Sequence, residues 1–195
     1  MDILLETEHL RLRRFTLADA DHLFALDNDP EVMRYLNGGT PVSRAAIEEE
    51  ILPGFMRVDM VNPAFGFWAA EGIGTGEFVG WFSLRPLEER ETAVLGYRLV
   101  KKVWGRGYAT EGVRALIRKG FNEMGIRRVV ATTYEENVAS RRVMEKVGMT
   151  LVRRFRLTAD DLASSDTFHT ETVEVWDGDD VEYALEKSTW EQSTL

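Results

Sequence analysis

The sequence contains no cysteine among its 195 residues. Disulfide bonds, thiolate metal sites and a cysteine nucleophile are therefore excluded. Histidine is scarce as well, because only His9, His22 and His169 occur, and they lie too far apart in the sequence for a metal-binding motif. We therefore expect no bound metal ion.

A long apolar segment is also missing. No stretch approaches the roughly 20 apolar residues of a membrane-spanning helix. The first residues, MDILLETEHLRLRRF, are acidic at the place where a secretory signal needs a basic start and an apolar run. We interpret the chain as cytoplasmic, with no membrane partner.

Positive charge is in deficit, with 24 Lys and Arg against 33 Asp and Glu and a formal net charge of −9. Nucleic-acid affinity depends on basic side chains that displace counterions, so this balance argues against a nucleic-acid partner and suits an amine-bearing one. The composition is otherwise that of a globular protein, at 44% hydrophobic and 29% charged residues. We expect one domain over residues 1–195.

Strand-like and helix-like patterns alternate along the chain. Residues 3–15 predict a first strand, and Thr16 is the predicted N-cap of the following helix. Ser43 is predicted to cap a further helix that breaks near Pro53. Two aromatic and β-branched runs joined by EGIGTG predict a hairpin. Further strands are expected at residues 92–100, 127–134, 150–157 and 181–190.

The segment KKVWGRGYATEGVRALIRKG, residues 101–120, combines two glycines with a helix start. Glycine is unfavourable there unless something must come close to the backbone. A helix that opens after such a loop presents unpaired N–H groups, and its dipole adds partial positive charge. Gly105 and Gly107 thus predict a diphosphate site with Arg106 at its rim, and a plain strand-to-helix turn is the alternative. The Walker and dinucleotide patterns are not met.

The helix itself is predicted from apolar residues that recur at intervals of three and four. They are Ala109, Val113, Leu116, Ile117, Gly120, Phe121 and Met124. A strand follows, and a second helix is expected to start at Asn137 and to end at Gly148.

Residues 95–149 resemble the acetyl-CoA-binding core of the GNAT N-acetyltransferases, in particular the RimJ/RimL-type branch. The opening residues 6–36 resemble the N-terminal strand and helices of that branch, so that the similarity covers most of residues 5–157. It implies an α/β fold with a mixed, mostly antiparallel sheet of about seven strands, splayed central strands and flanking helices. The cofactor-binding core would then comprise residues 93–149.

The resemblance implies a set of cofactor-binding residues. Trp104 stands where the family signature has Gln or Arg, a change that costs little because backbone N–H groups hold the pyrophosphate. Those groups belong to Arg106, Gly107, Tyr108, Ala109 and Thr110. The preceding strand, at Leu99, Val100 and Lys101, would pair with the pantetheine amides. The N–H near Val100 would face the thioester carbonyl as an oxyanion donor.

The family's second motif, Asn-x-x-Ser before Lys-x-Gly, is met by Asn137, Ser140, Lys146 and Gly148. Asn137 would bond the pantetheine arm, and Ser140 would lie near the sulfur. Helix capping alone is the alternative for both residues.

Acetyl transfer to nitrogen requires a neutral amine, whereas a free lysine amine has a pKa near 10.4 and an α-amine near 8. A base, acting through water, must remove a proton, and the leaving thiolate needs an acid. Many family members carry a tyrosine for the second task, but its place is taken by Met144. Ser140 is therefore the first candidate acid and Tyr134 the second. Proximity to the bound thioester supplies part of the rate.

The base is not identified from the sequence. The glutamate that related sequences carry before the Gly-Tyr pair is Val94 here. Glu91, Glu135 and Glu136 are neighbours in the sequence only, and solvated surface charges are the simpler interpretation of all three.

Residues 158–188 are expected to form a substrate-side loop and a last strand. The loop is acidic and would attract an amine or be merely solvated; its acidic residues include Asp160, Asp161, Glu171, Glu174, Asp177 and Asp179. His169 is a candidate base or a packed loop residue. Trp68 and Trp81 are predicted core residues rather than a substrate wall.

We therefore expect an acetyl-CoA-dependent N-acetyltransferase that works by direct attack in a ternary complex, with acetyl-CoA as cosubstrate. The acceptor would be a protein N-terminus or a small-molecule amine, and a homodimer is compatible with the sequence. Two alternatives stay open. One is a catalytically silent acyl-CoA-binding or sensing module, and the other is a protein that holds a different phosphorylated ligand.

Overall fold

The computed structural model describes residues 2–57, 62–87, 91–156 and 178–194. One sheet of eight strands runs through them in the order β1-β2-β3-β4-β5-β6-β8-β7. Every neighbouring pair is antiparallel except β5–β6. The strands are β1 (Ile3–Glu6), β2 (Leu10–Arg13), β3 (Gly66–Gly72), β4 (Phe78–Pro86), β5 (Thr92–Leu99), β6 (Arg128–Tyr134), β7 (Thr150–Phe155) and β8 (Asp180–Glu186). The predicted mixed, mostly antiparallel fold is confirmed.

The sheet has eight strands rather than about seven because residues 3–15 form two strands. Thr7 causes the break: its Oγ1 accepts the N–H of Leu10 at 3.0 Å, and its own N–H donates to the Leu10 carbonyl at 2.8 Å. A threonine side chain that bonds the backbone nearby favours a turn over a continuous strand. The predicted first strand is therefore the β1–β2 hairpin.

The helical segments are η1 (Leu17–Asp19), α1 (Ala20–Asp27), α2 (Pro30–Met33), α3 (Arg44–Ala46), η2 (Ile47–Ile51), α4 (Leu52–Met56), η3 (Lys101–Val103), α5 (Tyr108–Glu123), α6 (Val138–Lys146) and α8 (Lys187–Thr194). The predicted N-caps are confirmed. Thr16 forms a capping box with Asp19, and the Oγ of Ser43 accepts the Ala46 N–H at 3.0 Å. Each cap satisfies a backbone donor that the first helical turn leaves unpaired.

The predicted break near Pro53 is wrong, because helical structure continues to Met56. The π-helical turn η2 comes directly before α4, and Pro53 is the second residue of α4. At that position the missing N–H of proline is tolerated.

The predicted last strand, residues 181–190, is too long, since the observed strand β8 ends at Glu186. Glu186 pairs with Arg128 at the start of β6, so the chain beyond has no strand partner and turns into α8.

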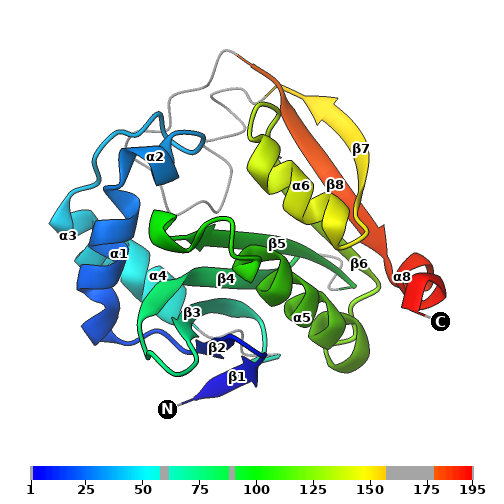
Figure 1. Ribbon diagram of the computed structural model, residues 1–195, viewed down its shortest axis with the longest axis horizontal. Helices are drawn as coiled ribbons and strands as arrows, with labels where there is room; N and C mark the ends of the chain where they lie inside the picture. Colours follow the sequence, from blue (N-terminus) through cyan, green and yellow to red (C-terminus); the bar gives the residue numbers. More distant parts are fainter. Residues whose placement is uncertain (1, 58–61, 88–90, 157–177, 195) are drawn as a thin grey trace.

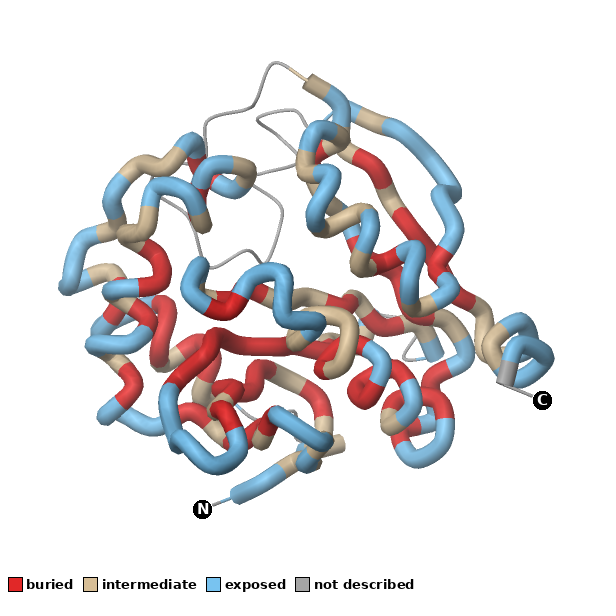
Figure 2. The backbone as a smooth tube through the Cα atoms, in the orientation of Figure 1, coloured by how far each residue is buried: buried red, intermediate tan, exposed pale blue. Residues whose placement is uncertain are grey.

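Two apolar cores lie on opposite faces of the sheet, because alternate strand residues point to opposite sides. Trp68 and Phe82 belong to the core under α5 and α6. Phe67 and Trp81 belong to the core under the N-terminal helices. Figure 1 shows these two groups of helices on opposite sides, and Figure 2 shows the buried central strands between them. Trp68 and Trp81 are confirmed as core residues, at 2% and 8% exposure.

The central strands diverge. Strands β5 and β6 pair in parallel only where residues 92–94 face residues 128–130. Beyond that point β5 continues along β4 and β6 continues along β8, as Figure 1 shows. We call this region, residues 95–99 of β5 facing residues 131–134 of β6, the β5–β6 divergence. It gives the predicted splay of the central strands a definite location.

Candidate active site

The junction between β5 and α5 has the geometry of an anion site. Gly105 and Gly107 have φ angles of 75° and 86°, and a Cβ added at either would have no heavy atom within 4 Å. The first intrahelical bond of α5 runs from the Glu111 N–H to the Gly107 carbonyl. The N–H groups of Tyr108, Ala109 and Thr110 precede that bond, and no side chain of the described residues caps this helix end.

A close contact sets the position of α5 on the sheet. A Cβ at Gly112 would lie 2.3 Å from the Phe82 ring of β4, so only glycine allows the helix to approach this strand. Residues of α5 and β4, with Phe82 fully buried, form the common core. This contact fixes how closely the first turns of α5 pack against β4.

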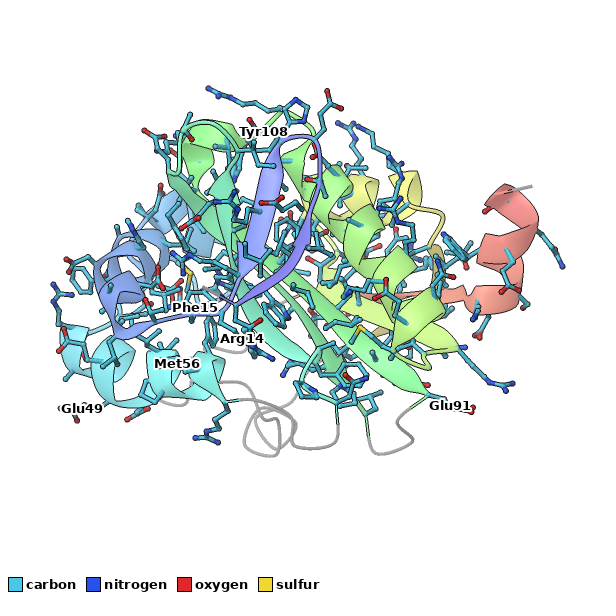
Figure 3. All side chains as sticks on the ribbon, turned by 90° about the horizontal axis from the view of Figure 1, so that it is seen from below. Arg14, Phe15, Glu49, Met56, Glu91 and Tyr108 are labelled. Atoms are coloured by element: carbon cyan, nitrogen blue, oxygen red, sulfur yellow. The ribbon has the colours of Figure 1, made fainter. Side chains whose placement is uncertain are left out.

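The β1–β2 hairpin closes one side of the helix start. Glu111 accepts hydrogen bonds from the backbone N–H of His9 and from its ring Nδ1, both at 2.9 Å. Burial raises the pKa of Glu111, but hydrogen bonds from Thr7 and His9 outweigh it and hold that pKa below its usual value. The His9 and Tyr108 rings are 5.6 Å apart. Figure 3 shows Tyr108 beside this hairpin.

The backbone of β5 presents Leu99 rather than Val100 to the divergence. The Val100 N–H donates to the Val79 carbonyl of β4 at 3.0 Å. Backbone groups of successive residues in an antiparallel strand point to opposite sides, so those of Leu99 point away from β4. The Leu99 carbonyl accepts the Trp104 indole N–H at 2.9 Å. The expected oxyanion role of the Val100 N–H is therefore corrected, because that donor is already used within the sheet.

The remaining predicted strand residue, Lys101, lies in η3 with an exposed side chain. Its Nζ contacts Glu31 in the first turn of α2. The contact ties the cofactor-side loop to the N-terminal helices.

The second junction brings Asn137 and Ser140 to the start of α6. Asn137 caps the helix, since its Oδ1 accepts the Ser140 N–H at 3.2 Å. The Ser140 Oγ lies 2.8 Å from the hydroxyl of Tyr97 on β5, and the Ser140 carbonyl, a second possible acceptor of the single Tyr97 proton, lies 3.1 Å from the same hydroxyl. Burial raises the pKa of Tyr97 to about 12. Sequence reasoning used the Gly-Tyr pair only to locate Val94 and missed Tyr97.

The other candidate acid is placed differently. Tyr134 is 8% exposed at the end of β6, and its ring stacks on Tyr35 with centroids 5.9 Å apart. Its hydroxyl packs against Gly178, where an added Cβ would lie 2.1 Å away. Met144, at the place of the family tyrosine, is 1% exposed in the core. It offers no proton donor.

The candidate carboxylates do not gather at one place: Glu135 and Glu136 directly precede the α6 cap, and Glu91 lies elsewhere. Glu91 precedes β5 and pairs with Arg127 at 3.3 Å, and Figure 3 shows it at the end of the molecule opposite Tyr108. Glu135 pairs with Arg154 at 2.8 Å, and Glu136 is exposed. The acidic loop up to Asp177, with His169, lies outside the described residues.

The last acidic residues before and in β8 are described. Asp179 lies 3.7 Å from Arg156. Burial, and then the charge of Asp179, raise the pKa of Asp180. The described part of the chain contains no group of three or more His, Asp and Glu side chains that could hold a metal ion. None of its helices is both long and apolar enough to cross a membrane.

Comparison with known proteins identifies the family. Residues 9–150 match the acetyltransferase (GNAT) domain. The FsC-acetyl coenzyme A-N(2)-transacetylase of Aspergillus fumigatus is 35% identical over 162 residues, which cover 77% of this chain and 66%, just under two thirds, of that protein. The protein YkkB of Bacillus subtilis is 34% identical, with 74% and 84% covered.

Solved structures agree with the fold. A GNAT-family acetyltransferase from Bacillus anthracis superimposes with a TM-score of 0.74 at 25% identity, covering 96% of this chain and 99% of that one. The ribosomal L7/L12 α-N-protein acetyltransferase RimL, in complex with coenzyme A, gives 0.75 over 95% and 98% of the two chains. Its identity of 18% shows the fold alone, so the RimJ/RimL branch is not confirmed. The prediction of an acetyl-CoA-dependent N-acetyltransferase is confirmed at the level of the family. The chain belongs to the GNAT acetyltransferases.

Proposed function

We propose that this protein transfers the acetyl group of acetyl-CoA to a primary amine by direct attack in a ternary complex. The helix start of α5 is the observation that carries the proposal. Three successive backbone N–H groups there precede the first intrahelical bond, beside two glycines that leave open space. A diphosphate satisfies such donors and complements the helix dipole.

The remaining parts of the cofactor follow from this position. The pyrophosphate would be held by the backbone of residues 106–110, with the exposed Arg106 side chain at the rim. The pantetheine arm would run along the β5–β6 divergence and pair with the Leu99 backbone as an added strand. Asn137 would meet it from the start of α6. The thioester would then lie near Ser140, with the Leu99 N–H in place of the Val100 N–H as the oxyanion donor.

The reaction removes two protons from the nitrogen of an ammonium acceptor, one before attack and one from the tetrahedral intermediate, and adds one to the leaving thiolate. Water would carry the nitrogen protons to solvent, because the candidate carboxylates Glu91 and Glu135 are held in ion pairs with arginine side chains. Ser140 is the proposed donor to the leaving thiolate, and Tyr134 remains the second candidate. Holding both reactants together supplies much of the rate in such an enzyme.

The acceptor is a primary amine of a small molecule or of a protein N-terminus. The names of two similar proteins span this range: one denotes an N(2)-transacetylase, and the other an α-N-protein acetyltransferase. The RimJ/RimL-like opening of the sequence supports the protein acceptor as a proposal. A single domain acting in the cytoplasm is part of the same proposal.

Calorimetry with coenzyme A followed by a thiol-release assay over a panel of amines and peptides tests the function. We expect saturable sub-millimolar binding and release of coenzyme A with at least one amine. Absence of binding would contradict the proposal. The buried Met144 favours a second candidate, a silent acyl-CoA-binding module. Tight binding with no thiol release on any amine would support that module instead.

A further inference from the structure

Two hydroxyl groups meet across the β5–β6 divergence. Tyr97 lies on β5 three residues beyond Val94, the last residue that pairs with β6. Ser140 lies in the first turn of α6, which follows β6. Their oxygens are 2.8 Å apart, so this side-chain bond joins strand and helix where the sheet has separated.

The two hydroxyl groups carry two protons, and the hydrogen bond between them uses only one. Tyr97 has a single hydroxyl proton, and both the Oγ and the carbonyl oxygen of Ser140 lie within its reach, at 2.8 and 3.1 Å. When Tyr97 donates to the Oγ, the proton of Ser140 is released from the pair and can donate to a third group. A phenol is a stronger acid than an alkyl hydroxyl, which favours this direction.

The backbone of β5 indicates where a group that accepts the Ser140 proton would lie. The Leu99 backbone points into the divergence, two residues along β5 from Tyr97. A thioester bound against Leu99 would therefore have its sulfur on the side of the divergence that holds the start of α6. Met144, the α6 residue at the place of the family tyrosine, is buried in the core and has no proton to give.

We propose, resting on the acetyltransferase function above, that Tyr97 is a positioning residue that directs the Ser140 proton to the leaving sulfur. When the C–S bond of the tetrahedral intermediate breaks, its electron pair passes to sulfur and the Ser140 Oγ–H delivers the proton, forming the thiol. Tyr97 passes its own proton to the Ser140 Oγ. The nitrogen of the acceptor gives two protons to solvent, one from the ammonium ion before attack and one from the tetrahedral intermediate. The tyrosinate recovers one of them from solvent and the other remains there, so protons and charge balance.

The phenol of Tyr97 is protonated at neutral pH and begins each turnover as a donor, as it would at its ordinary pKa near 10. Burial raises this pKa to about 12, so the tyrosinate formed in the step takes up a proton again at once. The hydrogen bond to Ser140 acts in the opposite direction but is the smaller influence.

The first test compares Tyr97→Phe with Tyr183→Phe. Tyr183 is a matched control because its hydroxyl also bonds α6, donating to Glu145 at 2.9 Å and accepting from Arg141 at 3.2 Å, but it reaches the helix from β8. We expect Tyr97→Phe to lower kcat about 10- to 100-fold, within the range of general acid catalysis. The Kd for coenzyme A and the KM for the amine should stay within about 2-fold. Tyr183→Phe should keep kcat within about 2-fold.

Two further measurements separate proton delivery from packing. Ser140→Ala should lose as much activity as Tyr97→Phe, and the double variant should lose no more, because both residues act in one path. Replacing Tyr97 by 3,5-difluorotyrosine keeps the ring and the hydroxyl but lowers the phenol pKa. It should therefore move the alkaline limb of kcat to lower pH. Circular dichroism and thermal melting verify that each variant is folded.

The outcomes are distinct. An active wild type with an unaffected Tyr97→Phe, or a Tyr97→Phe that loses coenzyme A affinity while kcat is kept, would overturn this inference and leave the acetyltransferase function intact. Additive losses in the double variant would overturn it as well. Wild-type protein that binds coenzyme A but releases no thiol on any amine would overturn both proposals.

Discussion

The side-chain oxygen of Asn137 accepts the Ser140 N–H at 3.2 Å, which makes Asn137 the cap of α6. The cap uses the oxygen, so the amide nitrogen is the group with which Asn137 can donate to a ligand carbonyl. Capping and the proposed cofactor binding would therefore depend on different atoms of one side chain. Substitutions can separate the two roles.

Asn137→Ser keeps a capping oxygen and removes the amide nitrogen. Serine is among the best N-cap residues, so thermal stability should change little. Loss of one ligand hydrogen bond should weaken coenzyme A binding by about 1 kcal/mol, or about 5-fold. Calorimetry and thermal melting measure the two effects. Asn137→Ala loses both groups, so it should lower both the coenzyme A affinity and the melting temperature. If Asn137→Ser binds coenzyme A with wild-type affinity, Asn137 acts only as a helix cap.

Gly107→Ala should weaken coenzyme A binding by about 10-fold or more. Its φ of 86° is unfavourable for alanine, and the added methyl group enters the space beside the orphan N–H groups. Gly125→Ala is the matched control, because Gly125 has a φ of 75° and open surroundings at the other end of α5. Calorimetry should show unchanged affinity for the control at a similar loss of stability. Equal affinities in both variants would contradict the phosphate site.

Asp19→Asn should destabilise the fold by about 3–5 kcal/mol, the range for breaking a buried ion pair. Asp19 is 1% exposed and accepts two hydrogen bonds from Arg13, at 2.7 and 2.8 Å. Urea unfolding at pH 7 measures the loss. Asp21→Asn, at an exposed ion pair with Arg44, is the control and should leave stability nearly unchanged.

The same aspartate predicts a pH dependence. Burial raises the pKa of Asp19, but hydrogen bonds from Arg13 and Thr16 outweigh it and lower that pKa below its ordinary value. The unfolded state then binds the proton more readily, so this stabilisation is present above about pH 4 and is lost as the pH falls. The stability difference between wild type and Asp19→Asn should shrink between pH 7 and pH 3. A constant difference would contradict this assignment.

Tyr97 predicts a second pH dependence, of opposite sign. Its pKa is raised to about 12 in the fold, against about 10 in the unfolded chain. The unfolded state loses this proton first, so the contribution of Tyr97 to stability declines as the pH rises from about 10 to about 12. Chemical unfolding of wild type and Tyr97→Phe in this interval should show a difference that changes with pH. Parallel curves would exclude a buried phenol at this position.

Local features were predictable from the sequence. The caps Thr16, Ser43 and Asn137, the apolar face of α5 and the glycines before it depend on short-range chemistry, and the structure has each of them. The Thr7 turn was missed because one threonine in an alternating run is a weak signal. Its effect on the chain appears only in the paired hairpin.

The errors within the site have a different origin. Whether the N–H of Val100 or that of Leu99 points into the divergence depends on the strand register, and a shift of one residue exchanges the two. The contact between Tyr97 and Ser140 joins residues 43 positions apart. It depends on how far β5 and β6 separate, which no local pattern encodes.

The short parallel pairing of β5 and β6 has a consequence for how the sequence can diverge in evolution, because it leaves strand backbone open to a ligand. A coenzyme recognised mainly through peptide groups makes few demands on side-chain identity, because every residue carries the same N–H and C=O. On the proposed mode of binding, substitutions such as Trp104 at a signature position would then be tolerated over most of the chain without loss of coenzyme recognition. Relatives about one third identical can therefore keep a common acyl donor and diverge in the molecules that they modify.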